Sequence, residues 1–199
     1  VLCLVIAGHA ARADAPAILV LGDSLSAAYG LRVEQGWVSL LADRLKTSGY
    51  GYRVVNASVS GETTTGGRAR LPSLLERYNP AFVLIELGGN DGLRGLPLSL
   101  MRENLTDMIQ LSQSSGATVM IAGMQIPPNY DPRYTEPFFA QYAELAEEFD
   151  LYLIPFLIDG IPQQPELMQA DGIHPKAEAQ SMILDNFWPV LLEALQPSD

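Results

Sequence analysis

The chain contains 199 residues, of which 48% are hydrophobic and 18% charged, so it suits one folded domain and is unlike a disordered protein. A formal net charge of −11 offers no basic surface for nucleic acid or anionic membranes, and neither is expected as a partner. After the first ten residues no apolar stretch reaches the roughly 18 residues that span a bilayer, so no stable membrane anchor is expected.

The N-terminal residues have the character of a targeting segment. Residues 1–10 form an apolar run, and residues 11–13 read Ala-Arg-Ala, the small-x-small pattern of a signal-peptide cleavage site. A first buried strand or helix would also be apolar, but Asp-Ala-Pro at 14–16 interrupts the pattern before the next apolar run. We therefore expect 1–13 to be the remnant of a secretory signal, 14–199 to form a single domain, and the protein to be periplasmic or secreted.

Strand-like and helix-like patterns alternate along the rest of the chain. Short apolar runs predict five strands, at 18–21, 52–56, 82–87, 118–122 and 151–154. Apolar residues recur at helical spacing over 37–45, 71–78, 98–109, 139–149 and from Pro175 onward. Pro72 is expected in the first turn of its helix, and Phe139 on the apolar face of its own. This alternation predicts an α/β protein whose parallel sheet is covered on both faces.

Polar residues and glycines follow the predicted strands. Asp23 and Ser24 come directly after the first strand, Gly61 follows the second, and Asn90 follows the third. A late loop over 171–174 reads Asp-Gly-Ile-His. Because the carboxyl ends of parallel strands meet at one edge of a sheet, where ligands bind, we expect these residues to lie close together.

These residue types are the parts of an acyl-transfer site. Ser24 needs a base to become a nucleophile, and His174 is the single histidine that remains after a cleavage at residue 13. Asp171, three residues earlier, is placed to fix the tautomer of the imidazole. The backbone N–H of Gly61 and the side-chain amide of Asn90 suit the stabilisation of an oxyanion.

Each of these motifs has a simpler interpretation. Asp171 and His174 could form a helix cap beside a surface histidine, or half of a metal site, although the segment 14–199 offers no cysteine and no second histidine to complete one. The segments 88–91 and 58–61 could be ordinary turns. Their joint occurrence after successive strands favours catalysis, and no metal is predicted.

The motifs together resemble the four sequence blocks of the SGNH (GDSL) hydrolase family. The blocks correspond to Gly-Asp-Ser-Leu-Ser at 22–26, Gly61, Gly-Asn-Asp at 89–91 and Asp171-x-x-His174. The resemblance implies a flavodoxin-like three-layer αβα fold with a five-stranded parallel sheet in the order 2-1-3-4-5, and no cofactor. It also implies roles for individual residues: Ser24 as nucleophile, His174 as base, Asp171 as its orienting acid, and Ser24, Gly61 and Asn90 as the oxyanion hole.

Three longer stretches refine this resemblance. They are G-G-N-D-G-L-R-G at 88–95, M-Q-I-P-P-N-Y at 124–130 and M-Q-A-D-G-I-H-P at 168–175. They are similar to the periplasmic multifunctional thioesterase, protease and lysophospholipase branch of the family and to its arylesterase relatives. The resemblance therefore implies hydrolysis of acyl thioesters, lysophospholipids and small aryl esters.

A fatty acyl chain would need an apolar cleft beside the nucleophile. The candidate substrate-binding residues are Asp23, Leu93, Leu96, Ile126, Pro128 and Tyr130. The apolar members of this set could instead only seal the rim of the sheet. Two other functions stay open: deacetylation of carbohydrate O-acetyl esters, and a non-catalytic flavodoxin-like binding module. We expect a monomer that acts on a small-molecule ester or thioester.

Overall fold

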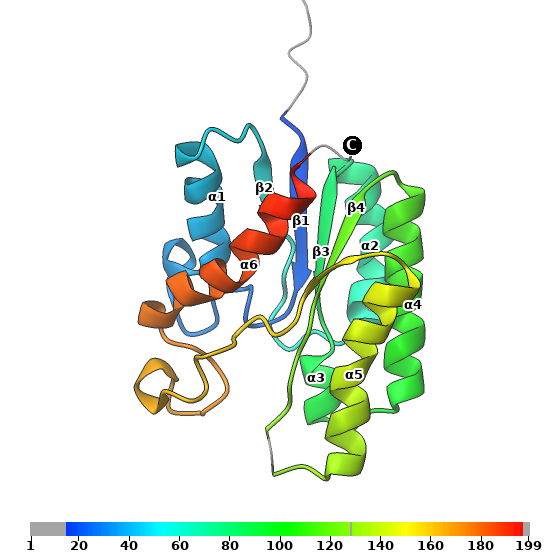
Figure 1. Ribbon diagram of the computed structural model, residues 1–199, viewed down its shortest axis with the longest axis vertical. Helices are drawn as coiled ribbons and strands as arrows, with labels where there is room; N and C mark the ends of the chain where they lie inside the picture. The colour runs from blue at the N-terminus through cyan, green and yellow to red at the C-terminus, as the bar shows by residue number, and fades with distance from the viewer. Residues whose placement is uncertain (1–14, 128, 197–199) are drawn as a thin grey trace, which may run out of the picture.

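The computed structural model describes residues 15–127 and 129–196 (Figure 1). The expected signal remnant at 1–13 lies outside the described residues. Five strands form one parallel sheet in the order β2-β1-β3-β4-β5, as predicted. The strands are β1 (Ala17–Gly22), β2 (Arg53–Asn56), β3 (Phe82–Glu86), β4 (Thr118–Ala122) and β5 (Tyr152–Ile154).

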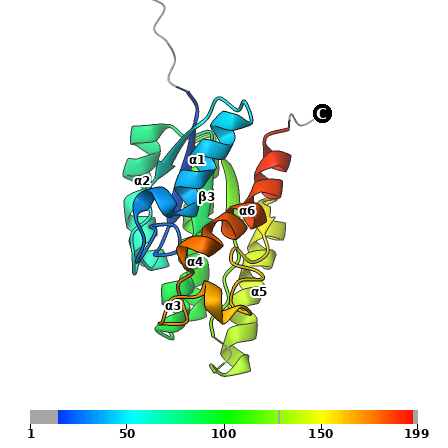
Figure 2. The ribbon, with the colours of Figure 1, turned by 90° about the vertical axis from the view of Figure 1, so that its left-hand side faces the viewer.

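Helices cover both faces of the sheet and give three layers (Figures 1 and 2). One face carries α1 (Trp37–Thr47) and α6 (Gln180–Ala194), and the other carries α2 (Thr64–Tyr78), α4 (Leu98–Ser114) and α5 (Pro132–Glu148). A short helix, α3 (Gly89–Leu93), follows β3, and 3₁₀ turns occupy Val33–Gln35, Pro165–Leu167 and Ala177–Ala179. In this part of the chain no helix has both the length and the apolar character needed to cross a membrane.

Strand β1 shows why the sheet lies in the middle of the molecule. Ile18 and Val20 point into the core under α1 and α6, whereas Leu19 and Leu21 point into the core under α2, α4 and α5. All four side chains are fully buried. Successive side chains of a strand face opposite sides, so a continuous apolar run is what a strand covered on both faces requires.

Helix α2 begins seven residues before the predicted start, so the expectation that Pro72 lies in a first turn is wrong. Thr63 caps the helix, with its hydroxyl accepting from the N–H of Gly66 at 3.5 Å, and Pro72 lies in the helix interior. Two glycines in the first turn conceal this start, because glycine is a poor helix former. Gly67 is needed there, since a Cβ on it would overlap the Leu87 side chain.

The buried face of α5 agrees with the predicted stripe except at its first aromatic residue. Phe138 is fully buried whereas Phe139 is 37% exposed, so the aromatic residue in the core is Phe138. Helix α6 begins at Gln180, after a 3₁₀ turn, and not near Pro175. The difference at Phe138 arises because two adjacent aromatic residues both suit the helical stripe, and only packing selects one. The later start of α6 follows from the 3₁₀ turn Ala177–Ala179 that precedes it.

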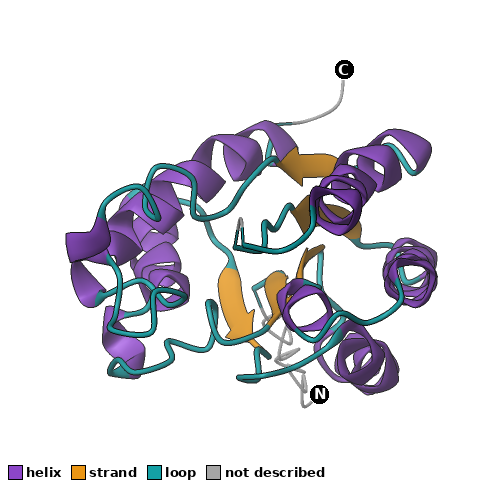
Figure 3. Cartoon of the chain, turned by 90° about the horizontal axis from the view of Figure 1, so that it is seen from below, coloured by secondary structure: helices purple, strands orange, loops and turns teal. Residues whose placement is uncertain are grey.

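The carboxyl ends of the strands meet at the lower edge of the sheet in Figure 1, which faces the viewer in Figure 3. The loops that leave β1, β2 and β3, together with α3, lie along this edge. Each of them carries a residue from the predicted site.

Candidate active site

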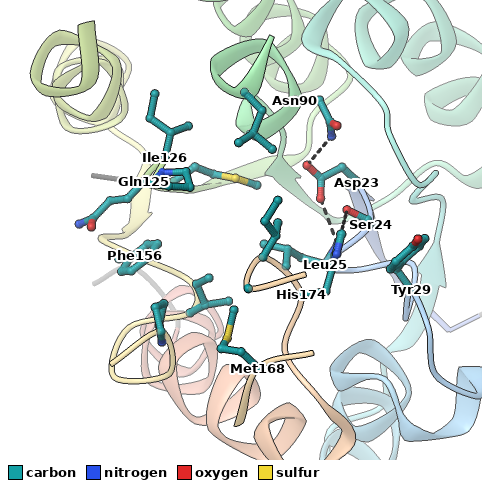
Figure 4. A pocket seen from close by; sticks show the side chains of 18 of the residues that line it. Asp23, Ser24, Leu25, Tyr29, Asn90, Gln125, Ile126, Phe156, Met168 and His174 are labelled. Atoms are coloured by element: carbon teal, nitrogen blue, oxygen red, sulfur yellow. Dashed lines mark hydrogen bonds between the residues drawn. The ribbon is translucent and has the colours of Figure 1, made fainter. Parts of the chain in front are cut away.

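Three side chains form a continuous hydrogen-bonded series at this edge. The Oγ of Ser24 lies 2.9 Å from Nε2 of His174 (Figure 4). Nδ1 of the same ring lies 2.7 Å from Oδ2 of Asp171. Ser24 follows β1 directly, and its backbone carbonyl accepts from the N–H of Tyr29 at 3.2 Å in the turn that comes next. The serine and the histidine are 150 positions apart in sequence, so the fold brings them together.

The loop from Asp171 to His174 holds the carboxylate under the imidazole. Its Oδ1 accepts hydrogen bonds from the backbone N–H of His174, at 3.0 Å, and of Ile173, at 2.9 Å. Gly172 has a φ of +68°, a left-handed conformation that glycine adopts without strain. The hydrogen bonds from His174 and Ile173 lower the pKa of Asp171 to about 2, so this carboxylate stays charged at neutral pH.

The residues expected to stabilise an oxyanion lie on neighbouring loops. Asn90 is in the first turn of α3, and Gly61 is in the loop after β2 with a φ of +79°. Both line the same cavity as Ser24. Arg94, which follows α3, donates from Nη2 to the carbonyl of Gly61 at 2.9 Å and so joins the two loops.

Asp23 is buried behind the nucleophile, with only 3% of its surface exposed. Its Oδ2 accepts from Nδ2 of Asn90 at 3.0 Å, and its Oδ1 accepts from the N–H of Leu25 at 3.0 Å (Figure 4). Its own N–H donates to Oε2 of Glu86 at 3.1 Å. Burial raises the pKa of Asp23 to about 6. These contacts tie Asp23 to the other site residues, although it also borders the cavity.

Glu86 is a second buried carboxyl in this region, and no motif points to it. It ends β3 with 0% exposure, and its Oε2 also accepts from Oγ of Ser26 at 2.6 Å. Burial, and then the neighbouring charge of Asp23, raise the pKa of Glu86 well above its usual value. The sequence signal is a lone acid at the end of the apolar run Phe82–Glu86, where a side chain faces the core.

A cavity of about 670 Å³ opens beside Ser24. Of the candidate substrate-binding residues, Asp23, Leu93 and Ile126 line it, and Pro128 lies outside the described residues. Leu96 and Tyr130 are not among its described lining residues. The hydroxyl of Tyr130 instead donates to the carbonyl of Leu93 at 3.0 Å, so Tyr130 supports a residue that lines the cavity.

The opposite wall of the cavity comes from the long connection after β5, of which the sequence motifs include only the end, from Met168 onward. Its lining residues are Phe156, Ile158 and Met168. Tyr29, from the turn after β1, lines the cavity beside His174 (Figure 4). The signal that points to the first three is positional, because ligands of parallel sheets bind beyond the carboxyl ends of the strands, and this segment follows one. Among the described residues, no three His, Cys, Asp or Glu side chains are grouped so as to hold a metal ion.

A parallel three-layer α/β fold with Ser, His and Asp in hydrogen-bonded series at the carboxyl edge defines the class: a serine hydrolase of the SGNH type. The comparison with protein families agrees. The profile of the GDSL-like Lipase/Acylhydrolase family matches residues 20–181, and the chain belongs to this family.

Individual relatives cover nearly the whole chain. Esterase TesA of Pseudomonas aeruginosa is 50% identical over 189 residues, which are 95% of this chain and 94% of the relative. Thioesterase 1/protease 1/lysophospholipase L1 of Escherichia coli is 44% identical over 95% of this chain and 86% of its own length. A crystal structure of TesA superposes with a TM-score of 0.88 at 51% identity, over 90% of this chain and 99% of that one.

Proposed function

We propose that the protein hydrolyses carboxylic esters and thioesters through an acyl-enzyme on Ser24. The observation that carries the proposal is the series from Ser24 through His174 to Asp171, with contacts of 2.9 and 2.7 Å, beside a largely apolar cavity. The names of the relatives, an esterase and a thioesterase/lysophospholipase, support the same substrate classes.

In acylation, Oγ of Ser24 attacks the carbonyl carbon while Nε2 of His174 takes its proton. The charged Asp171 holds Nδ1–H and stabilises the imidazolium that forms. The N–H groups of Ser24 and Gly61 and the amide of Asn90 surround the oxyanion, where one such donor is worth about 3–4 kcal/mol in the transition state. The bond to the leaving oxygen or sulfur then breaks, and His174 gives its proton to that group.

Deacylation repeats these steps with water. His174 removes a proton from water as its oxygen attacks the acyl carbon of the Ser24 ester. The same oxyanion site stabilises the second tetrahedral intermediate. When it collapses, the carboxylic acid leaves and Oγ of Ser24 recovers its proton from His174, so no cofactor is required.

The cavity walls support broad acyl specificity. Leu93, Met124 and Ile126 form one side, and Phe156 and Met168 the other, so the space between them is suited to an aliphatic chain. A volume of about 670 Å³ lies within the usual range for small-molecule sites, about 300–1,000 Å³. We also propose that the enzyme acts outside the cytoplasm, because residues 1–13 have the pattern of a signal peptide.

The central test is the substitution Ser24→Ala. We expect hydrolysis of a p-nitrophenyl acyl ester and of an acyl-CoA to fall by at least about 10³-fold, because the nucleophile is lost, while the circular dichroism spectrum stays unchanged. A fluorophosphonate probe should label the parent protein and not this variant. The matched control is Ser73→Ala, which changes an exposed serine of α2 and should leave the rates unchanged.

Two results would contradict the proposal. Parental turnover by the Ser24→Ala protein would exclude this mechanism, and an unlabelled, inactive parent would favour a binding module. A series of p-nitrophenyl esters from acetyl to palmitoyl defines the substrate in the same assay. A strong preference for acetyl would support the carbohydrate O-acetylesterase alternative instead of the acyl cleft.

A further inference from the structure

Tyr29 belongs to none of the four sequence blocks, yet its ring contacts the ring of His174. The centroids are 4.3 Å apart and the ring planes are inclined by 35° (Figure 4). Tyr29 is 48% exposed, whereas the side chain of His174 is 16% exposed. Tyr29 is thus only half buried, and its ring lies against the base of the proposed catalytic series.

We propose that Tyr29 is a positioning residue for ester hydrolysis, whose ring holds the imidazole of His174 and stabilises the imidazolium that forms when Ser24 loses its proton. The inference rests on the proposed function, since the imidazolium exists only if His174 acts as the base. The face of an aromatic ring carries negative potential and attracts a cation lying over it. The stabilisation is therefore greatest when the proton is on His174, which is the state that acylation must reach.

The backbone of Tyr29 is fixed at both ends, which keeps its ring in place. Its N–H donates to the carbonyl of Ser24 at 3.2 Å. Its carbonyl accepts from Nε2 of Gln169 at 2.9 Å, and the same nitrogen donates to the carbonyl of Pro175 at 3.1 Å. The N–H of Gln169 donates to the carbonyl of His174 at 2.8 Å.

These bonds form a closed path from the nucleophile to the base. It runs from Ser24 to Tyr29, from Tyr29 to Gln169 and from Gln169 to His174, and it is completed by the contact of 2.9 Å between Ser24 and His174. Gly30 has a φ of +73°, and a Cβ there would overlap the amide of Gln169. The glycine after Tyr29 therefore leaves the space that the amide of Gln169 needs to reach the Tyr29 carbonyl.

Charged groups also act on His174 from two directions, and a test must leave them in place. Asp171 touches Nδ1 at 2.7 Å from the same loop, and Asp23, at the end of β1, interacts electrostatically with the ring. Both carboxylates favour the protonated imidazole, as the ring of Tyr29 does. Substitutions at Tyr29 retain both, so a change in pH dependence reports the aromatic contact alone.

The test compares Tyr29→Leu with Tyr29→Phe over pH 5–9, with p-nitrophenyl acetate as substrate. We expect Tyr29→Leu to lower kcat by about 3- to 30-fold, the factor that a cation–π contact of this kind confers, with little change in KM. The acid limb of its pH–rate profile should move to lower pH, because the imidazolium without the ring loses its proton more readily. Tyr29→Phe retains the aromatic face and should restore both quantities.

A second variant tests the path that holds the ring. Gln169→Met removes both hydrogen bonds donated by Nε2 and should change kcat and the acid limb in the same direction as Tyr29→Leu, by a smaller factor. Parental kcat with an unmoved acid limb in Tyr29→Leu would overturn the inference. So would a Tyr29→Phe protein as impaired as Tyr29→Leu, because the hydroxyl and not the ring would then be needed.

Fluorophosphonate labelling separates this inference from the proposed function. A parent that is active and labelled at Ser24, together with an unimpaired Tyr29→Leu variant, refutes only the role of Tyr29. A parent that is neither active nor labelled refutes the hydrolase itself.

Discussion

At the scale of single residues, Asp23 connects more of the site than any motif assigns to it. Its carboxylate receives one N–H of the Asn90 amide at 3.0 Å, which leaves the second hydrogen of that amide free to face the substrate. Its backbone N–H is held by Glu86 at 3.1 Å, and Ser24 is the next residue. The buried carboxyl thus fixes the direction of the Asn90 amide, the proposed oxyanion donor, and the start of the turn that carries Ser24.

Replacing Asp23 by asparagine tests this positioning role. Asp23→Asn leaves one acceptor oxygen for the two donors, Asn90 and Leu25, so the amide of Asn90 loses its fixed direction. We expect kcat to fall by about 10- to 100-fold with KM little changed, less than the loss of about 10²–10³ when an oxyanion donor is deleted. Steady-state kinetics on a p-nitrophenyl ester measures both constants.

The control for this prediction is Asp43→Asn, which makes the same replacement of a carboxylate by an amide at an exposed position of α1. It should leave kcat unchanged. The stability of Asp23→Asn at pH 8 should be no lower than that of the parent, because the substitution removes a buried charge. Parental kcat in Asp23→Asn would show that Asn90 is oriented by other contacts.

The residues with chemical motifs could be found from the sequence, and those without motifs could not. Ser24, Asp171 and His174 follow from residue type and spacing, and the structure places them in contact. Glu86 and Tyr29 are recognised only in three dimensions, because a lone acid at a strand end and a tyrosine in a turn are common. Their significance depends on partners that lie far away in sequence.

At the scale of secondary structure, the five-residue helix α3 positions Asn90, the proposed oxyanion donor. Asp91 accepts from the N–H and the hydroxyl of Thr64 at 2.9 and 2.6 Å, which fastens α3 to the first turn of α2. Arg94 fastens its other end to Gly61. The sequence shows only a glycine-rich turn here, because so short a helix has no periodicity, and its position is set by these tertiary bonds.

The residue that precedes α3 has both a left-handed backbone and close neighbours. Gly88 has a φ of +119°, and a Cβ on it would overlap the hydroxyl of Tyr142 and lie 3.2 Å from Sδ of Met101. We expect Gly88→Ala to destabilise the fold by about 2–4 kcal/mol, from backbone strain and overpacking, and to lower kcat by displacing Asn90. Thermal denaturation and steady-state kinetics check the two effects.

Gly95→Ala is the matched control, because Gly95 also has a positive φ, +63°, but no atom lies within 4 Å of its added Cβ. It should cost only the strain of the left-handed conformation, about 1–2 kcal/mol. Combining Gly88→Ala with Tyr142→Phe removes the overlapping hydroxyl and should recover part of the lost stability. Equal effects of the two alanine substitutions would mean that packing at Gly88 is unimportant.

At the scale of the whole molecule, stability and activity are expected to favour different pH values. The pKa of Asp23 is raised by burial from 3.8 to about 6, so between these values the folded state binds a proton that the unfolded state releases. Stability therefore falls as pH rises through this range, by on the order of 2–3 kcal/mol for this group. Glu86, with its pKa raised in the same direction, extends the fall to higher pH.

Asp171 acts in the opposite sense. Its pKa is lowered from 3.8 to about 2, so its stabilising contacts are complete above about pH 4 and are lost as pH falls toward 2. The opposing slopes place the stability maximum near pH 4. Hydrolysis by general-base catalysis should increase toward pH 8, where the net charge of −11 and the buried carboxyls reduce stability.

The substitution Glu86→Gln separates the buried carboxyl from the general effect of charge. Glutamine keeps an oxygen for the N–H of Asp23 and the hydroxyl of Ser26, but it cannot ionise. Its Tm should equal that of the parent near pH 4 and exceed it at pH 8, by about 2–4 °C for each kcal/mol gained. Glu147→Gln alters the net charge equally at an exposed site of α5 and should reproduce little of this gain. If the parent Tm stays level from pH 5 to pH 8, or if both variants gain equally, the buried pair does not control the pH dependence of stability.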